Sequence, residues 1–343
     1  MKTSELFGKQ FKIFLLVTYG IPYLMGIFMA FGYFSERDLS LFASVQMLCP
    51  AAGVIVAVIT SHQHKELIPQ RFFKVYLAMT VIGIVCAVTS VFALNKELNA
   101  IFPIIAMVGS ISLLLTFLLD EDIKLKAFGI LGISWKKVLP ASVLFFVLLI
   151  TRLFISCLLE GQVAAFNEIL WNPQILFRLL ITVPNFFLSF VFFFGEEYGW
   201  RYYLQPLLQK KFGAIKATLI MGFMWGIWHL PLNIFFYNKP EHAVYSIVTQ
   251  LITCMVLGIY FAYFYMKTQN IWGPIFFHYL NNSFGSVLLG QYETSGGEKA
   301  DAADILIFAA ISFCVFGLFI FTKFYRDPKN RSETLEEQVA KFE

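Results

Sequence analysis

The stretch LSFVFFFGEEYGWR, residues 188–201, joins an apolar run directly to two carboxylates and an arginine. A charged side chain at the centre of a bilayer costs about 2.5–3.5 kcal/mol on the scale measured by membrane insertion. Charges at such a depth are therefore functional candidates by default. Glu196, Glu197 and Arg201 are the first candidates in this chain.

The composition around this stretch is that of a membrane protein. The 343 residues are 58% hydrophobic and 14% charged, whereas soluble domains contain roughly 45–50% and 25%. The apolar residues also come in blocks of about twenty, which is the length of helix that spans a hydrocarbon core. The sequence therefore predicts an all-α fold, a polytopic bundle of transmembrane helices.

Ten spans are expected, at about residues 11–33, 40–60, 75–94, 99–119, 138–158, 176–208, 214–236, 244–266, 272–290 and 303–322. With a cytoplasmic N-terminus, this arrangement places 20 of the 26 Lys and Arg residues on the cytoplasmic side and 6 outside. Because basic residues collect in cytoplasmic loops, both termini are expected in the cytoplasm. The net charge of +4 then suits a surface of anionic lipid and requires no nucleic acid.

Three polar groups fall at one depth in this arrangement. Glu196, His229 and His278 lie 14, 13 and 11 residues from the lysines that mark the cytoplasmic ends of their spans. At 1.5 Å per residue these separations are about 21, 20 and 17 Å. Trp225 lies one turn before His229 and is expected to hold its ring by stacking. The three helices are therefore expected to bring these groups together inside the membrane.

The helical spacing distinguishes the two glutamates. Glu197 and Arg201 are i,i+4 partners in the favoured order, with the acid first. Glu196 lies about 100° further round the helix and lacks this partner, so it is expected to be free to exchange a proton. His278 and Asn282 are also i,i+4 and point an imidazole and a carboxamide from one face.

These groups limit the chemistry. No Ser or Cys adjoins a histidine in a nucleophile motif, and the five cysteines are expected to be packing residues. A glutamate acting as general base on water, assisted by a histidine, fits what is present. A second histidine with an asparagine then supplies oxyanion donors. The alternative uses Glu196, His229 and His278 as zinc ligands, since two His and one Glu form a known catalytic set.

At these residues the chain resembles the CAAX-protease and bacteriocin-processing family of intramembrane endopeptidases, also called Abi-type. The family carries E-E-x-x-x-R, F-x-x-x-H and H-x-x-x-N on successive helices. The first and third motifs are present at residues 196–201 and 278–282. In the second, Trp225 stands where the family has Phe, four residues before His229. The resemblance covers roughly residues 190–286.

The resemblance implies a role for each residue. Glu196 with His229 would activate water, and His278 with Asn282 would hold the oxyanion. The remaining motif residues, Glu197 and Arg201, would shape the site, with Trp225 in a supporting position. A glutamate protease without cofactor is favoured over a zinc enzyme.

The implied activity is cleavage of a membrane-associated peptide or membrane protein without a prenyl group, in a prokaryotic plasma membrane. The alternative is a non-enzymatic membrane protein, a transporter or a bacteriocin-immunity scaffold, that uses the same cavity for binding. Residues 171–325 are expected to form the catalytic core, as one folding unit with the N-terminal helices of residues 1–170, which carry no motif. Residues 326–343 are expected to be a cytoplasmic tail with a short frayed helix.

Overall fold

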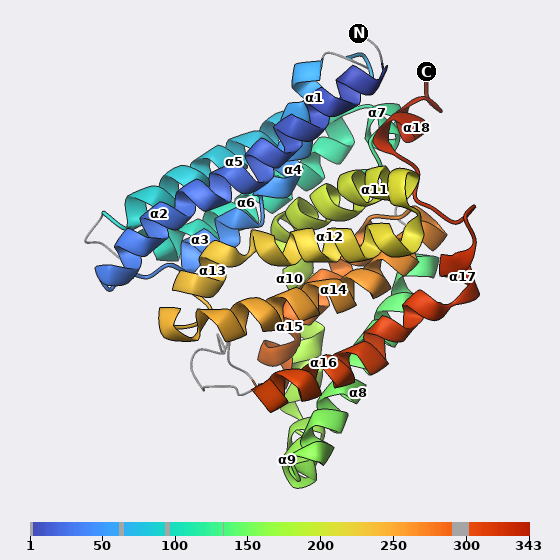
Figure 1. Ribbon diagram of the computed structural model, residues 1–343. Coiled ribbons are helices and arrows are strands. Elements are labelled where there is room, and N and C mark those ends of the chain that lie inside the picture. The colour runs from blue at the N-terminus through green and yellow to red at the C-terminus, as the bar shows by residue number, and fades with distance from the viewer. Residues whose placement is uncertain (1–2, 62–64, 93–96, 133, 290–301) are drawn as a thin grey trace.

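A computed structural model describes residues 3–61, 65–92, 97–132, 134–289 and 302–343 (Figure 1). Within these residues the chain is helical, with loops and turns but no strand. This confirms the predicted fold class, a polytopic bundle of helices. In Figure 1 the start of the first helix and the last C-terminal residues lie close together at one end of the bundle, and the side of the membrane on which they lie stays a prediction.

The helices follow one another with short connections. The α-helices of the first half are α1 (Thr3–Leu15), α2 (Ile21–Phe34), α3 (Ser40–Gln46), α4 (Cys49–Ser61), α5 (Gln70–Ser90), α6 (Glu97–Leu119), α7 (Asp122–Ala127), α8 (Trp135–Leu159) and α9 (Val163–Leu170). Those of the second half are α10 (Gln174–Glu197), α11 (Gln205–Phe212), α12 (Ala214–Trp228), α13 (Leu230–Phe235), α14 (Ala243–Thr268), α15 (Trp272–Leu289), α16 (Ala302–Phe316), α17 (Lys323–Arg326) and α18 (Leu335–Val339). Two π-helical segments, η1 (Leu16–Gly20) and η2 (Tyr198–Leu204), continue α1 into α2 and α10 into α11. Two 3₁₀ segments are η3 (Pro240–His242) and η4 (Gly317–Phe321).

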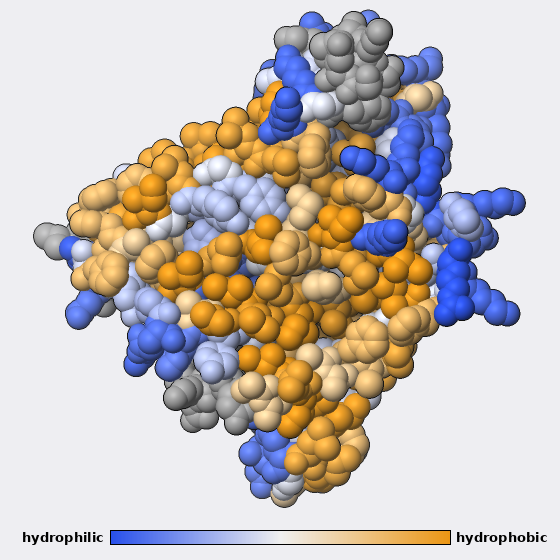
Figure 2. Space-filling model, viewed as in Figure 1, coloured by the Kyte–Doolittle hydropathy of each residue, from blue (hydrophilic) through white to orange (hydrophobic). Residues whose placement is uncertain are grey.

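Within the described residues, eight helical stretches are long and apolar enough to cross a membrane. They are Gly8–Phe34, Ser40–Ser61, Gln70–Ser90, Ile101–Leu119, Trp135–Leu159, Gln174–Phe212, Pro240–Thr268 and Ala302–Phe321. The protein is thus an integral membrane protein. Figure 2 shows the corresponding apolar surface across the middle of the molecule, with hydrophilic residues gathered toward its ends.

The two remaining predicted spans, 214–236 and 272–290, do not meet these criteria. The first is divided because α12 ends before His229 and α13 begins after it. The second forms α15, whose hydropathy is lowered by the polar residues of its middle turns. Both spans lie in the part of the bundle that carries the candidate site. The predicted span ends at residues 94 and 290 lie outside the described residues.

The N-terminal helices pack tightly on the stretch that carries the glutamates. Helix α4 lies against α1, α10 and η2. A Cβ atom added to Gly195 would collide with the Met47 carbonyl oxygen and the Tyr76 hydroxyl, and one added to Gly199 would collide with Pro50. Two small residues four positions apart let helix backbones approach closely inside membranes. The predicted N-terminal part and catalytic core therefore share an interface, and their folding as one unit stays a prediction.

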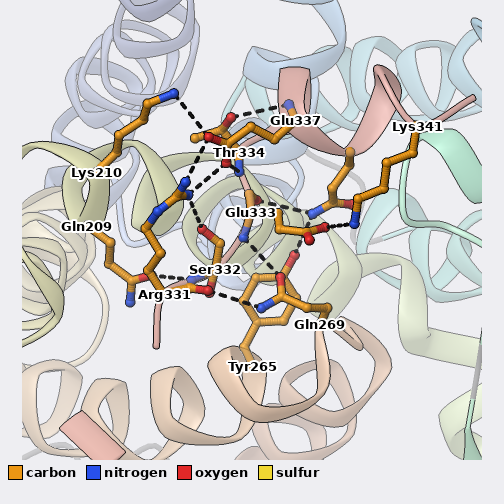
Figure 3. Close-up of polar contacts among 11 residues, drawn as sticks. Gln209, Lys210, Tyr265, Gln269, Arg331, Ser332, Glu333, Thr334, Glu337 and Lys341 are labelled. Carbon is orange, nitrogen blue, oxygen red and sulfur yellow. Dashed lines mark hydrogen bonds and ion pairs between the residues drawn. The ribbon is translucent and has the colours of Figure 1, made fainter. Parts of the chain in front are cut away.

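The tail, residues 326–343, differs from the frayed helix that was expected. The Thr334 hydroxyl accepts a hydrogen bond from the Glu337 backbone N–H at 3.3 Å, and the Glu337 carboxylate accepts one from the Thr334 N–H at 3.0 Å. This capping box starts α18, and Leu335 and Val339 of that helix are buried. Figure 3 shows the polar contacts that hold the tail against α11 and α14. The tail is docked because its apolar face is buried and its polar groups are paired.

Candidate active site

A cavity of about 540 Å³ lies among α3, α10, α12, α13, α14 and α15. Its walls include five residues that the sequence analysis selected: Glu196, Trp225, His229, His278 and Asn282. Helices α10, α12 and α15, with the turn that follows α12, thus bring these side chains to one space. The roles of the residues stay a prediction at this point.

The cavity extends to one side of the glutamates only. On α10 its lining runs from Ser189 to Glu196, and on α15 it runs from His278 to Ser283. Lys210 lies near the C-terminal end of α11. Both runs of lining residues extend from the level of Glu196 in the direction away from Lys210. On the Lys210 side, the residues of η2 are buried. The cavity therefore opens toward the end of the bundle opposite the basic residues of α11.

The two glutamates have different partners. Glu197 is fully buried and makes the predicted ion pair with Arg201, at 3.2 Å from Nε. Its other carboxylate oxygen lies 2.8 Å from Nδ1 of His278. Glu196 faces the cavity, and its Oε2 atom accepts a hydrogen bond of 2.6 Å from the Trp225 indole N–H. Glu197 is thus committed to two structural contacts, and no donor in the described part of the chain contacts the Oε1 atom of Glu196.

Trp225 does not stack on His229 as expected. Their ring centroids are 6.2 Å apart and the rings are inclined at 51°. The Trp225 ring instead lies under the Arg201 guanidinium, 4.3 Å from its central carbon, while its N–H binds Glu196. A buried guanidinium attracts an aromatic face more strongly than a neutral imidazole does. Trp225 therefore links the arginine of the first motif to the cavity-facing carboxylate.

His229 is held in one orientation at the break between α12 and α13. Its Nδ1 atom is 2.9 Å from the Trp225 carbonyl oxygen. Because a carbonyl oxygen only accepts hydrogen bonds, Nδ1 carries the proton. The neutral ring then presents an unprotonated Nε2. The Trp228 ring meets the imidazole edge-on, with centroids 4.8 Å apart at 82°.

His278 is anchored through the same nitrogen. Its Nδ1–H donates to the Glu197 carboxylate, which leaves Nε2 as the atom available to a ligand. The neighbouring Asn282 side chain is exposed, and its oxygen accepts a hydrogen bond of 3.1 Å from Asn281. No acceptor in the described part of the chain contacts the Asn282 amide nitrogen. Both side chains can thus offer a nitrogen to a group in the cavity.

The alternative with zinc requires three ligand atoms about 2.0–2.2 Å from one point. Across the described residues, no group of three or more His, Cys, Asp or Glu side chains is arranged to hold a metal ion. In this arrangement Glu196, His229 and His278 do not form a three-ligand zinc site, and the choice between a glutamate and a zinc mechanism stays a prediction.

Several residues of the cavity wall were missed by the sequence analysis. The Cys254 sulfur lies 3.9 Å from Nδ1 of His229, although all cysteines were expected to be packing residues. Gln250, one turn earlier on α14, donates to the Cys254 sulfur at 3.4 Å. In the sequence, a polar residue one turn before a cysteine inside an apolar span is the pattern that could have pointed to Gln250 and Cys254. Ser44 and Met47, from α3 and the turn after it, line the cavity without any motif.

Residues 173–284 match the family model described as "Type II CAAX prenyl endopeptidase Rce1-like". The match extends from the start of α10 into α15 and includes every residue of the three motifs. This region belongs to the Rce1-like family. One curated relative, CAAX prenyl protease 2 of Methanococcus maripaludis, is 30% identical over 105 residues, which are 29% of this chain and 39% of that protein. No solved structure gives a significant match.

The Rce1-like match does not include helices α1 to α9 or the residues after 284. The curated relative is likewise matched over well under half of its length. The family assignment therefore applies to the region that carries the motifs, and the N-terminal helices must be understood from the structure alone.

Proposed function

We propose that this protein is an intramembrane endopeptidase that hydrolyses a peptide bond in a membrane-associated peptide or membrane protein. The observation that carries the proposal is a single cavity lined by Glu196, His229, His278 and Asn282, in which both imidazoles are anchored through Nδ1. The membership of residues 173–284 in the Rce1-like family supports it.

Glu196 is the general base in this mechanism. A water molecule between Glu196 and the Nε2 atom of His229 loses a proton to the carboxylate as its oxygen bonds to the peptide carbonyl carbon. When the C–N bond breaks, the protonated Glu196 returns the proton to the leaving amine. The products are a new carboxyl terminus and a new amino terminus. The Trp225 N–H orients the carboxylate throughout, because it binds Oε2 and leaves Oε1 for the water.

The oxyanion that forms on the peptide carbonyl needs hydrogen-bond donors. The Asn282 amide N–H is one such donor. Nε2 of His278 is a second donor when the ring enters the reaction as the imidazolium, with a proton gained from solvent before the substrate binds, and the Glu197 carboxylate at 2.8 Å stabilises that form. One well-placed donor lowers such a barrier by about 2.7–4 kcal/mol. Arg201 balances the charge of Glu197 on the side away from the cavity.

The proposed substrate is a peptide or membrane protein without a prenyl group, of the kind that bacteriocin processing supplies, and the proposed location is a prokaryotic plasma membrane. The enzyme is of the glutamate type. Elemental analysis of purified, active protein tests this point, because stoichiometric zinc together with inhibition by chelators would contradict it.

The proposed orientation has both termini in the cytoplasm, which makes the cavity open to the outer side of the membrane. Labelling by a membrane-impermeant thiol reagent tests it in a variant without natural cysteines. Asn281→Cys should react in intact cells and Lys210→Cys only in inverted vesicles. The reverse pattern would overturn the orientation.

The activity itself is tested by comparing the peptides released from membranes that contain the wild-type protein or Glu196→Gln. This substitution keeps the shape of the side chain and removes the base. Cleavage products should disappear with Glu196→Gln and persist with Glu241→Gln, a matched change of an exposed glutamate in η3 that does not line the cavity. Identical peptide profiles for all three proteins would reject hydrolysis and favour a binding scaffold.

A further inference from the structure

The end of α12 lacks part of its usual hydrogen bonding. The carbonyl of Ile227 would ordinarily accept from the N–H four residues later, but that residue is Pro231, which has no N–H. The carbonyl of Trp228 lies at the break between α12 and α13. Unpaired carbonyls inside a membrane are costly because no water is present to satisfy them. His229 follows these carbonyls directly, so whatever pairs them also fixes the position of His229.

The partners come from the N-terminal helices. The Tyr23 hydroxyl of α2 donates to the Ile227 carbonyl at 2.9 Å, and the Gln46 amide of α3 donates to the Trp228 carbonyl at 2.8 Å. Gln46 is 1% exposed, so it has no alternative partner in solvent. Both donors lie about 200 residues before their acceptors in the chain.

Trp228 is also held by its side chain. Its indole N–H donates to the Thr18 carbonyl of η1 at 2.7 Å. One turn earlier on α12, the Tyr19 hydroxyl donates to the Met224 carbonyl at 2.7 Å. The last two turns of α12 are therefore tied to the N-terminal helices through four hydrogen bonds. The Trp228 ring contacts the His229 imidazole edge-on, so these bonds also fix the position of a ring that packs against His229.

We propose that Gln46 and Tyr23 are positioning residues for His229. They hold the end of α12 so that Nδ1 of His229 stays on the Trp225 carbonyl and Nε2 faces the cavity. Neither residue touches the proposed reacting atoms, and both lie outside residues 173–284. The N-terminal helices thus complete a site whose motifs all lie elsewhere in the chain.

The structural part of this proposal stands without any enzyme activity, whereas its catalytic consequence rests on the proposed function. Gln46→Met keeps the length of the side chain and removes the donor, and Tyr23→Phe removes a single oxygen atom. Tyr260→Phe is the matched control, because its hydroxyl makes an interhelical bond of 2.9 Å to the Ala141 carbonyl away from the cavity.

The first measurement is the nitrogen NMR spectrum of full-length protein in lipid, labelled with ¹⁵N only in its five histidines. The variant His229→Gln assigns the His229 signals. Gln46→Met and Tyr23→Phe should shift or broaden the Nδ1–H signal of His229, while Tyr260→Phe leaves it unchanged. An unchanged His229 signal in both test variants would overturn the proposal. If Gln46→Met does not fold, Tyr23→Phe decides alone.

The second measurement is hydrolysis of a peptide identified by membrane profiling. A small displacement of a catalytic group lowers turnover by about 10- to 100-fold. Both test variants should show such a loss in kcat with little change in KM, and Tyr260→Phe should retain the wild-type kcat. Wild-type kcat in both test variants would overturn the catalytic consequence. A wild-type protein without peptidase activity would instead refute the proposed function, and the NMR result would still decide the positioning.

Discussion

The region 173–284 and the N-terminal helices contribute to the same cavity in different ways. The first supplies side chains with acid–base chemistry, such as Glu196 and His229, on helices that match a known family. The second supplies donors to backbone carbonyls, such as Gln46, and a close-packed surface against Gly195. The chemistry of the site therefore lies in one part of the chain and much of its positioning in another.

This contrast explains why only one of the two regions carries recognisable motifs. A general base must be a specific residue type at a specific position, whereas a backbone carbonyl can be satisfied by any donor that reaches it. The Tyr23 hydroxyl and the Gln46 amide are different chemical groups, yet each donates a hydrogen bond to a backbone carbonyl at the end of α12. A sequence pattern records the first requirement far better than the second.

The largest loss of stability is expected when one of the two adjacent glutamates of the matched region, Glu197, is replaced. Glu197→Gln removes the charge that balances the fully buried Arg201. Breaking a buried ion pair on one side costs about 3–5 kcal/mol, because the other charge stays buried and uncompensated. Thermal unfolding in detergent should show a large loss for Glu197→Gln and little change for Glu196→Gln. Equal losses for the two variants would contradict the division between a structural and a catalytic glutamate.

A smaller effect tests the packing between the two regions. Gly195→Ala places a methyl group against the Met47 carbonyl and the Tyr76 hydroxyl. Overpacking of this kind costs about 1–3 kcal/mol. Gly285→Ala is the matched control, because nothing lies within 4 Å of its added Cβ and alanine favours the helix. The same unfolding assay should rank Gly195→Ala below wild type and Gly285→Ala at or above it. The opposite order would mean that the N-terminal helices do not press on α10.

The smallest effect concerns the C-terminal tail, another segment without motifs that supports the matched region. Hydrogen bonds from the Arg331 guanidinium lower the pKa of Glu337 to about 2. A carboxyl with a lowered pKa in the folded state stabilises that state above its unfolded pKa, near 4.3. The contribution is then lost as the pH falls from about 4.3 through 2.

Limited proteolysis of the tail measures this effect. Cleavage between residues 326 and 343 should accelerate as the pH falls through that window, with an acid-stable protease as the probe. Glu337→Gln should remove the dependence and speed cleavage at neutral pH. The ratio of the cleavage rates of the wild-type and Glu337→Gln tails should therefore change between pH 6 and pH 2. A constant ratio would show that the Glu337 carboxylate does not hold the tail in place.

Much of this architecture could be predicted from the sequence. The lengths of the apolar blocks predicted helices that cross a membrane, and eight helical stretches of the described residues satisfy that requirement. The spacing of Glu197 and Arg201 predicted their ion pair, because neighbours on a helix are fixed by its 3.6-residue period. Equal depths predicted that Glu196, His229 and His278 would lie close together, and all three line the cavity.

The remainder depends on contacts between residues far apart in the chain. The break at His229 follows from Pro231, but the donors that make it tolerable are fixed only by tertiary packing. Trp225 was expected to face His229 because they are one turn apart, yet the charge of Arg201 on another helix attracts its ring. Helical periodicity cannot reveal such a competition between local and distant partners.

The central claim is that Glu196 activates water within the cavity shared by the two regions. The most direct test is hydrolysis of one identified peptide by purified protein in H₂¹⁸O, followed by mass spectrometry of the product. The wild-type protein should place one ¹⁸O atom in the new carboxyl group, and Glu196→Gln should form the same product at least ~100-fold more slowly. Product formation by Glu196→Gln at the wild-type rate would contradict the account.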